Sequence, residues 1–540
     1  MCWSWGVGLV AVTLVGADLA LDEYIYSAWP LDGVRFYWRF VEDDVVIASD
    51  AEPSDNARFE FAITAPGDVW IGFGVGEPTS GSMPGADIML ARVDSGTLIV
   101  GDYFSTDFAR PEEDCFQPSD WVGQGYEQNT SHTTVAVSRR VGATDTNNDR
   151  DLYTSGNDAK LIFAYGTFST DVMYHQSNRA TLTIGLHGLA TTLETSDVFT
   201  VDLVQDYYAV PAVRTTYANT ECVLPPGVDG SGRNPYIIGF ETIVSSETMK
   251  PRLHHLVVQS YSGTTCSGIP VTIAASASLY DLTKFPDDSG MLFTHGSYNV
   301  AIHYDNPDLT SDLVDSSGTR LFYTYEQPIN ELGILVLGDP FVQDSSDIPA
   351  GLSSWRFHCP ASCTDGWSEE ITIVSHFPHM HAVGSSMHTE FYGPDDTLLG
   401  SRGVEYFSFA NQQHENLYVP LTLPPGSRTV TQCTYDSPTI ENFGLGSDEE
   451  MCMHFILYYP AQSVFTGKYC GSAVCGSAEE NFVPESVERT FGTCEDTTST
   501  LVSTSSETSG TEPFIAKAGV DNSVCGLFCV ALFLHLSMMP

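Results

Sequence analysis

Histidines and one methionine in the second half of the chain are the residues best suited to metal chemistry. Imidazole nitrogen is a good copper ligand, and the soft thioether of methionine favours Cu(I). A redox metal held in this way could meet dioxygen and be reduced again. Three imidazoles followed by two imidazoles and a thioether indicate two copper-type ligand sets. In chain order they are His254, His255, His303, His379, His381 and Met451.

The alternative is that these are ordinary surface or core histidines, because short histidine motifs arise by chance in a chain with 15 histidines. His379 and His381 follow the apolar run 371–374. On an extended strand, residues i and i+2 share a face, so both imidazoles would point one way and Met380 the other. Neighbours such as His254 and His255 diverge on a regular strand. One metal there requires a twist or bulge and a third ligand from elsewhere.

The elements that must position these ligands are short strands. Apolar and β-branched runs separated by Gly, Pro, Asp and Asn fill the chain from residue 24 onward, and no long amphipathic helix stands out. A length of 540 residues suits about three domains. Proline-rich breaks near 211–227 and 349–351 divide the chain into candidate domains. We therefore predict an all-β protein with domains at 24–205, 206–350 and 351–490.

The formal net charge of −47 argues against nucleic-acid binding, because phosphates would be repelled. It is compatible with small cationic substrates, although a merely soluble acidic surface accounts for most of this charge. Oligomeric state cannot be read from the sequence.

Both ends of the chain carry targeting signals. Residues 1–20 read as a secretory signal peptide cleaved after Ala17 or Ala20, although basic residues are missing from its start. Residues 491–523 form a Ser/Thr-rich linker, and 524–540 form a hydrophobic tail. The tail fits a GPI-anchor signal, with a short membrane-spanning anchor as the alternative. We expect membrane attachment through this tail and a cell-surface or extracellular location.

Cysteine usage agrees with export. Of 13 cysteines, one lies in the signal and two lie in the tail, which leaves ten for disulfides in an oxidising compartment. The sequence Asn129-Thr130-Ser131 is a glycosylation sequon, with Asn129 as the acceptor.

Several collinear motifs over residues ~210–480 resemble the copper type II, ascorbate-dependent monooxygenases, in the pattern of dopamine β-monooxygenase and its relatives. They include Tyr236-Ile-Ile-Gly-Phe-Glu, Ile302-His-Tyr-Asp-Asn-Pro and Glu449-Glu-Met-Cys-Met-His. The N-terminal region resembles a DOMON domain through Trp70-Ile-Gly-Phe-Gly and Met83-Pro-Gly-Ala-Asp-Ile. The resemblance implies a DOMON β-sandwich followed by two jelly-roll-like copper-binding β-sandwich domains.

The same resemblance assigns roles to the ligands. His254, His255 and His303 correspond to an electron-transfer copper. His379, His381 and Met451 correspond to the copper that binds dioxygen and hydroxylates a C–H bond, with ascorbate as the electron donor. Met453 shares a strand face with Met451, so geometry alone leaves both open, and the Glu-Glu-Met-Cys context favours Met451. Tyr217 and His379 match active-site positions.

Substrate class follows less directly from the resemblance. Amidating relatives hold a peptide carboxylate at positions occupied here by Phe377, Met453 and Phe455, none of which can do so. Glu331 and Tyr458 match residues that could recognise an amine and a ring hydroxyl, unless they are buried structural residues. Phenylethylamine-like compounds are therefore the expected substrates.

The resemblance also implies disulfides and an alternative function. Met83 and His175 are candidate axial heme ligands by resemblance to heme-binding DOMON domains, although heme is not the favoured expectation. The alternative to a monooxygenase is a non-catalytic or electron-transfer surface protein with a heme- or sugar-binding DOMON domain. The implied pairs are Cys433–Cys452, Cys359–Cys470, Cys222–Cys266, Cys363–Cys475 and Cys115–Cys494.

Overall fold

The computed structural model describes residues 19–482 apart from short gaps. The expected signal peptide (apart from residues 19–20), the linker, the hydrophobic tail and the pair Cys115–Cys494 lie outside the described residues. The gaps are 32, 43–44, 48–56, 115–118, 143–147, 151, 153–158, 168–171, 187–196, 247, 269, 277–281, 294–295, 345, 410–411, 413 and 447.

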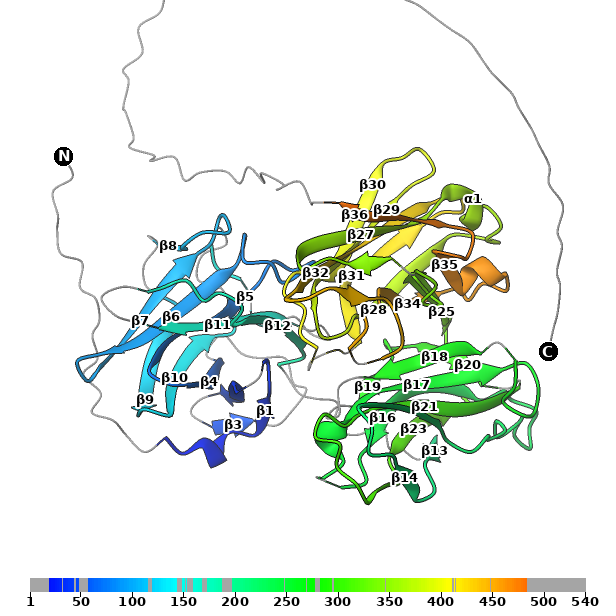
Figure 1. The fold of residues 1–540 in the computed structure, drawn as a ribbon, viewed down its shortest axis with the longest axis horizontal. Helices are drawn as coiled ribbons and strands as arrows, with labels where there is room; N and C mark the ends of the chain where they lie inside the picture. Colours follow the sequence, from blue (N-terminus) through cyan, green and yellow to red (C-terminus); the bar gives the residue numbers. More distant parts are fainter. Residues whose placement is uncertain are drawn as a thin grey trace, which may run out of the picture. The chain divides into compact units, whose positions relative to one another are not determined.

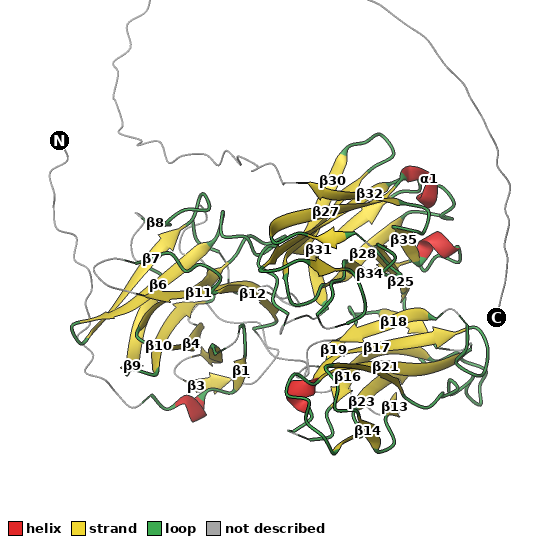
Figure 2. Cartoon of the chain, viewed as in Figure 1, coloured by secondary structure: helices red, strands yellow, loops and turns green. Residues whose placement is uncertain are grey.

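Alternation of polar and apolar residues makes almost all regular secondary structure of the described residues β (Figure 2). The fourth strand shows why: its sequence RFEFAITAP buries Phe59 and Phe61, while Arg58 and Glu60 are only partly buried. The prediction of an all-β fold is confirmed. Within the described ranges, none of the helices is long and apolar enough to cross a membrane. These helices are η1 (Leu21–Glu23), η2 (Lys250–Arg252), α1 (Ala361–Thr364) and η3 (Phe465–Gly467).

The first domain is a sandwich of two antiparallel sheets, ordered β1-β2-β4-β10-β9 and β12-β11-β5-β6-β7-β8 (Figure 1). Aromatic side chains such as Phe36, Trp38 and Phe73 fill the space between the sheets. The strands are β1 (Tyr26–Ala28), β2 (Arg35–Glu42), β3 (Val45–Ile47), β4 (Arg58–Pro66), β5 (Val69–Val75), β6 (Asp87–Asp94), β7 (Thr97–Phe104), β8 (Glu112–Glu113), β9 (Trp121–Gln128), β10 (His132–Arg140), β11 (Ala159–Thr167) and β12 (Arg179–Ile184).

The second domain packs the sheet β13-β23-β16-β20-β24 against the sheet β15-β21-β17-β18. Ile302, Tyr304 and Leu321 are fully buried in its core. The strands are β13 (Val198–Val204), β14 (Tyr208–Val210), β15 (Thr215–Asn219), β16 (Tyr236–Ile243), β17 (Leu253–Tyr261), β18 (Val271–Ser276), β19 (Thr283–Lys284), β20 (Ser289–Leu292), β21 (Ser297–Asp305), β22 (Leu313–Asp315), β23 (Gly318–Thr324) and β24 (Asn330–Glu331).

The third domain contains the sheets β31-β28-β34-β25-β35 and β30-β29-β32-β27-β36. Two core clusters belong to it, one around Trp367 and Ile373 and one around Trp355 and Met387, and further core residues such as Phe377 join the cluster of the second domain. The strands are β25 (Gly333–Gly338), β26 (Asp347–Ile348), β27 (Gly351–Cys359), β28 (Ile371–His379), β29 (Gly384–Tyr392), β30 (Leu398–Val404), β31 (Glu415–Leu423), β32 (Arg428–Ser437), β33 (Glu441–Asn442), β34 (Met453–Tyr459), β35 (Tyr469–Gly471) and β36 (Ser477–Phe482).

Strand pairing places two domain borders earlier than the proline breaks suggested. Strand β13, before residue 206, pairs with β23 and so belongs to the second domain. Strand β25, before residue 351, pairs with β34 and so belongs to the third. All three domains lie within one compact unit, residues 1–491. The prolines mark turns inside domains, because strand pairing and not local composition decides membership of a sheet.

Among the described residues, four disulfides cross-link the second and third domains internally. They are four of the five pairs that the resemblance implied. Cys433–Cys452 joins β32 to the residue before β34, close to Met451 in the chain. The other three are Cys222–Cys266, Cys359–Cys470 and Cys363–Cys475.

Candidate metal centre

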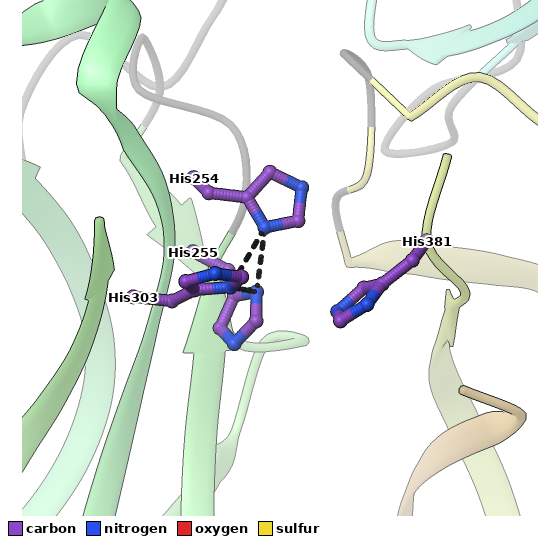
Figure 3. Close-up of side chains that lie close together, drawn as sticks. All are labelled: His254, His255, His303 and His381. Carbon is purple, nitrogen blue, oxygen red and sulfur yellow. Dashed lines mark hydrogen bonds between the residues drawn. The ribbon is translucent and has the colours of Figure 1, made fainter. Parts of the chain in front are cut away.

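Three histidines converge where β17 and β21 run side by side (Figure 3). His255 lies opposite His303 in this antiparallel pair, and the register shifts between Leu253 and His255. This bulge turns His254 to the same side as its neighbour. The Nδ1 atoms are 3.0 Å apart between His254 and His255, 3.1 Å between His254 and His303, and 3.4 Å between His255 and His303.

The size of this triangle fits a single metal ion. A first-row metal bonded to imidazole nitrogens at about 2.0 Å separates them by about 3.3 Å when its ligands are tetrahedral. All three side chains are buried, and His254 Nε2 has no hydrogen-bond partner among the described residues. Burial, together with the neighbouring imidazoles, lowers the pKa of each of the three, to about 3 for His303. Neutral imidazoles are the form that binds a metal.

His379 and His381 stand at the end of β28, and each has a partner that fixes its tautomer. His379 Nδ1 lies 2.7 Å from Gln412 Oε1. His381 Nδ1 lies 2.8 Å from the carbonyl oxygen of Glu449 and 3.0 Å from that of Gly446. An acceptor at Nδ1 keeps the proton there and leaves the lone pair on Nε2 for a metal. His381 Nε2 is indeed buried with no hydrogen-bond partner among the described residues.

Met451 belongs to the turn that fixes His381. The Glu450 carboxylate accepts hydrogen bonds from the backbone N–H groups of His381 at 2.9 Å and Val383 at 2.7 Å. Met451 follows directly and is buried, and its carbonyl oxygen accepts a hydrogen bond from Tyr435. Met453 opens β34 opposite His379. Met451 therefore follows the residue that bonds the His381 backbone, and Met453 lies opposite His379, so the choice of thioether stays a prediction.

The two predicted ligand sets meet in one cluster. Ring nitrogens of His254, His255, His303 and His381 all lie within 4.8 Å of one another (Figure 3). The ring centroid of His379 is 4.8 Å from that of His255. Five imidazoles from the second and third domains thus surround a common space. Sequence spacing gave no indication of this proximity.

Tyr217 flanks the three-histidine set. It lies opposite His303 in the pairing of β15 with β21. The two rings stack with centroids 4.4 Å apart, and the Tyr217 hydroxyl lies 3.3 Å from His303 Nδ1. The structure therefore places this predicted catalytic residue beside the first ligand set.

Aromatic side chains line the approach to His379. Phe377 lies parallel to its ring at 6.0 Å, and Phe455 lies 6.5 Å away. Both phenylalanines are almost fully buried. Phe409 stacks on His254 with centroids 3.9 Å apart. The walls around the imidazoles are apolar, which favours exclusion of water.

The structure does not bring Glu331 and Tyr458 to these histidines. Tyr458 is buried in a separate core cluster with Trp367 and Leu421. Its hydroxyl donates to the carbonyl oxygen of Gly467 and accepts from the N–H of Gln462, as a structural tyrosine does. Glu331 is exposed at the end of β24. Their proposed role in substrate recognition finds no support in these contacts.

Met83 and His175, the candidate heme ligands, line one cavity of about 1100 Å³. The Nδ1 atom of His175 lies 2.9 Å from the carbonyl oxygen of Gln176, which leaves Nε2 as the free nitrogen. The same cavity is lined by Trp70 and Tyr406. Heme binding at these residues stays a prediction, which a Soret absorption band in the purified protein would reveal.

Sequence reasoning missed the residues that hold the ligands in place. Gln412, Phe409 and Glu449 contact ligands that lie far from them in the chain. Gln412 and Phe409 lie in no motif, and Glu449, although it opens one, contacts His381 through its backbone carbonyl. Only the fold shows that these residues reach the centre.

Comparison with known proteins gives two family matches. Residues 330–482 match the family "Copper type II ascorbate-dependent monooxygenase, C-terminal domain", and residues 53–166 match the DOMON domain family. DBH-like monooxygenase protein 1 of Mus musculus is 25% identical over 442 residues, covering 75% of this chain and 70% of that protein.

Two further relatives match shorter stretches. Tyramine beta-hydroxylase of Caenorhabditis briggsae is 28% identical over 297 residues, covering 50% of this chain. Dopamine beta-hydroxylase of Bos taurus is 26% identical over 315 residues, covering 52% of this chain. The chain spans 49% of the length of each of these two proteins.

Among solved structures, the cytochrome b domain of pyranose dehydrogenase from Coprinopsis cinerea is 17% identical, with a TM-score of 0.23. It covers 28% of this chain, which in turn covers 77% of that domain. This likeness is too weak to carry an argument. The family matches show a DOMON domain and a copper type II monooxygenase C-terminal domain in this chain, and together with the relatives they support the dopamine β-monooxygenase-like family.

Proposed function

We propose that this protein is a copper monooxygenase that hydroxylates a C–H bond of a small substrate with dioxygen, using ascorbate as the electron donor. The observation that carries the proposal is the cluster of five buried imidazoles from two domains. Burial of an unpaired polar group costs free energy. A non-catalytic scaffold would therefore not explain why so many neutral imidazoles are buried around one space.

The residues present fit copper. His254, His255 and His303 would hold one ion, and His379 and His381 would hold a second together with the Met451 thioether. Copper bound there supplies the reductive activation of dioxygen. The chain itself contributes neutral ligands, and the partners of His379 and His381 keep their protons on Nδ1. The phenylalanines beside His379 and His254 keep water away from the reacting atoms.

The surroundings of His379 favour an aromatic substrate without a carboxylate. Phe377 and Phe455 are apolar side chains beside the His379 ring, and neither can pair with a carboxylate. A protonated amine suits a chain with a net charge of −47. The names of two relatives, a tyramine and a dopamine hydroxylase, fit this chemistry. Phenylethylamine-like compounds are therefore the substrate class that we propose.

The test is oxygen uptake by the copper-loaded full chain with ascorbate. A panel of phenylethylamines is compared with a glycine-extended peptide, and hydroxylated products are identified by mass spectrometry. We expect turnover of an amine and none of the peptide, and loss of turnover in the His379→Ala variant. Uptake that is equal in the wild type and in His379→Ala would contradict the proposal.

We also propose that the chain is exported through the secretory pathway. The four disulfides of its described part suit an oxidising compartment. Asn129 is exposed in the turn between β9 and β10, where an enzyme could reach it. A mass shift on treatment with a peptide N-glycosidase, absent in Asn129→Gln, would support glycosylation at this position.

A further inference from the structure

One stretch of the third domain touches a ligand from each predicted copper set. We call it the 403–415 segment; it joins β30 to β31, and its residues 410, 411 and 413 lie outside the described ranges. Phe409 stacks on His254 with centroids 3.9 Å apart. Gln412 Oε1 lies 2.7 Å from His379 Nδ1. The position of this segment therefore affects both ligand sets.

The DOMON domain holds the beginning of the segment. The N–H of Glu405 donates to the carbonyl oxygen of Ser80 at 2.8 Å, and the N–H of Thr181 donates to the carbonyl oxygen of Tyr406 at 3.0 Å. Lys160 Nζ donates to the carbonyl oxygen of Gly403 at 3.4 Å. Two of these are backbone bonds between domains, so they fix the path of the chain as well as single side chains.

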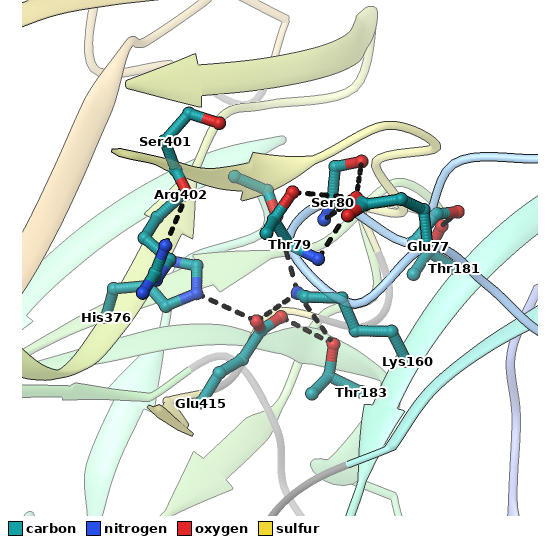
Figure 4. Close-up of polar contacts among 12 residues, drawn as sticks. Glu77, Thr79, Ser80, Lys160, Thr181, Thr183, His376, Ser401, Arg402 and Glu415 are labelled. Atoms are coloured by element: carbon teal, nitrogen blue, oxygen red, sulfur yellow. Dashed lines mark hydrogen bonds and ion pairs between the residues drawn. The ribbon is translucent and has the colours of Figure 1, made fainter. Parts of the chain in front are cut away.

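The DOMON domain also holds the end of the segment, at Glu415 (Figure 4). Lys160 forms an ion pair with Glu415 Oε2, and the Thr183 hydroxyl donates to Oε1 at 2.6 Å. His376 Nε2 lies 2.9 Å from Oε2, on the strand that ends at His379. All four residues are buried. Lys160 therefore contacts both ends of the segment.

Because the charges of Lys160 and Glu415 are buried, their contact requires both side chains to lie in fixed positions. Burial alone would raise the pKa of the Glu415 carboxyl, but Lys160 and His376 lower it below its ordinary value, so the group stays ionised. A buried ion pair adds little net stability, yet removal of one partner leaves an unpaired charge. Such a pair specifies where its members lie. Gln412 is three residues from Glu415, at most about 10 Å of chain, so the position of Glu415 limits where Gln412 can lie.

We propose that Lys160 and Thr183 of the DOMON domain are positioning residues for the copper centre. By fixing Glu415 and the start of the 403–415 segment, they hold Gln412 against His379 and Phe409 against His254. The proposal rests on the proposed function, in that the histidines bind copper. It gives the DOMON domain a role in the reaction that needs no ligand of its own.

The central variant is Thr183→Val, which removes the hydroxyl bond to Glu415 and keeps the side-chain shape. Thr183→Ser restores a hydroxyl, and Lys160→Met removes the ion pair. The matched control is Thr134→Val, because Thr134 is also a buried threonine of the DOMON domain and bonds Thr64 at 2.9 Å, with no contact to the 403–415 segment. Each variant is made in the full chain.

The first measurement needs no copper. Hydrogen exchange of the metal-free protein should become faster in peptides that cover residues 403–415 in Thr183→Val and Lys160→Met, and unchanged in Thr183→Ser and Thr134→Val. Unchanged exchange in both Thr183→Val and Lys160→Met would overturn the proposal. Equal acceleration in Thr134→Val would overturn it too, because general destabilisation would then explain the effect.

The second measurement follows copper in the loaded protein. We expect release of one copper to a chelator to be about tenfold faster in Thr183→Val than in the wild type, since loss of a residue that orients a ligand typically weakens metal binding 10–100-fold. The Cu(II) electron paramagnetic resonance signal of that ion should change as well. Wild-type release and spectrum in Thr183→Val overturn the positioning role. A wild type that binds no copper overturns the proposed function, while the exchange experiment still decides whether the DOMON domain holds the segment.

Discussion

The Nδ1 atoms of His254 and His255 lie 3.0 Å apart although the two residues are neighbours on one strand. Successive side chains of a regular strand point to opposite faces, so this approach requires an irregularity. The register shift between Leu253 and His255 in the pairing of β17 with β21 supplies it. Bulges of this kind re-aim side chains beside functional sites. The bulge is therefore the local structure that makes a metal site from a His-His pair.

Metal analysis can determine how many copper ions the two ligand sets bind. We expect two coppers in the reconstituted wild type and about one after His254→Ala and His255→Ala are combined, because only His303 of the first set remains. His132→Ala, which changes a partly exposed histidine at the start of β10 in the first domain, is the control and should keep both. A wild type that holds one copper would show that the five imidazoles form a single mixed site. Zinc without copper would exclude the copper proposal.

The thioether ligand is tested at Met451. Met451→Ile keeps an apolar side chain of similar volume but removes the sulfur, so we expect hydroxylation to be lost while the His254, His255 and His303 set still binds copper. The comparison is Met453→Ile, since Met453 lies opposite His379 in the sheet. Full activity in Met451→Ile together with loss of activity in Met453→Ile would move the ligand role to Met453.

Much of this arrangement could be predicted from the sequence, because histidines and methionine are chemically distinctive and strand runs have a period of two. The need for a bulge at His254-His255 followed from that period alone. The meeting of the two ligand sets could not be predicted, since it depends on how two domains pack. The same holds for Lys160 and Glu415, which are separated by 255 residues. Tyr458 matched a family position for substrate recognition, yet its hydroxyl forms hydrogen bonds with the protein backbone.

Gln412 orients His379 and should matter although it binds neither metal nor substrate. Gln412→Leu removes the acceptor at 2.7 Å from Nδ1, so the ring loses its fixed tautomer. We expect copper affinity or turnover to fall roughly 10–100-fold, as for other residues that orient metal ligands. Gln412→Glu keeps an acceptor and should retain more of the copper affinity. Affinity in Gln412→Leu equal to that of the wild type would show that Nδ1 needs no partner.

The stability of the first domain should depend on pH through Asp102, on β7. Burial, with a further contribution from the neighbouring Asp87, raises the pKa of the Asp102 carboxyl to about 7. Its Oδ1 has no hydrogen-bond partner among the described residues, so the charged form is poorly solvated. Between about pH 4 and pH 7 the folded protein holds this proton and the unfolded chain does not. The contribution of Asp102 to the free energy of unfolding is therefore greatest below pH 4 and falls as the pH rises to 7.

The test is Asp102→Asn, which removes the titrating group and keeps an oxygen to accept the N–H of Asp120. Denaturant unfolding of the metal-free protein, followed by tryptophan fluorescence, is compared at pH 5 and pH 8. We expect the variant to gain stability relative to the wild type at pH 8, by up to roughly 4 kcal/mol, since each pKa unit corresponds to about 1.4 kcal/mol. The gain should be much smaller at pH 5. Asp68→Asn, at an exposed turn, controls for the loss of one negative charge. A variant that is less stable than the wild type at pH 8 would show that Asp102 is ionised and stabilising in the folded protein.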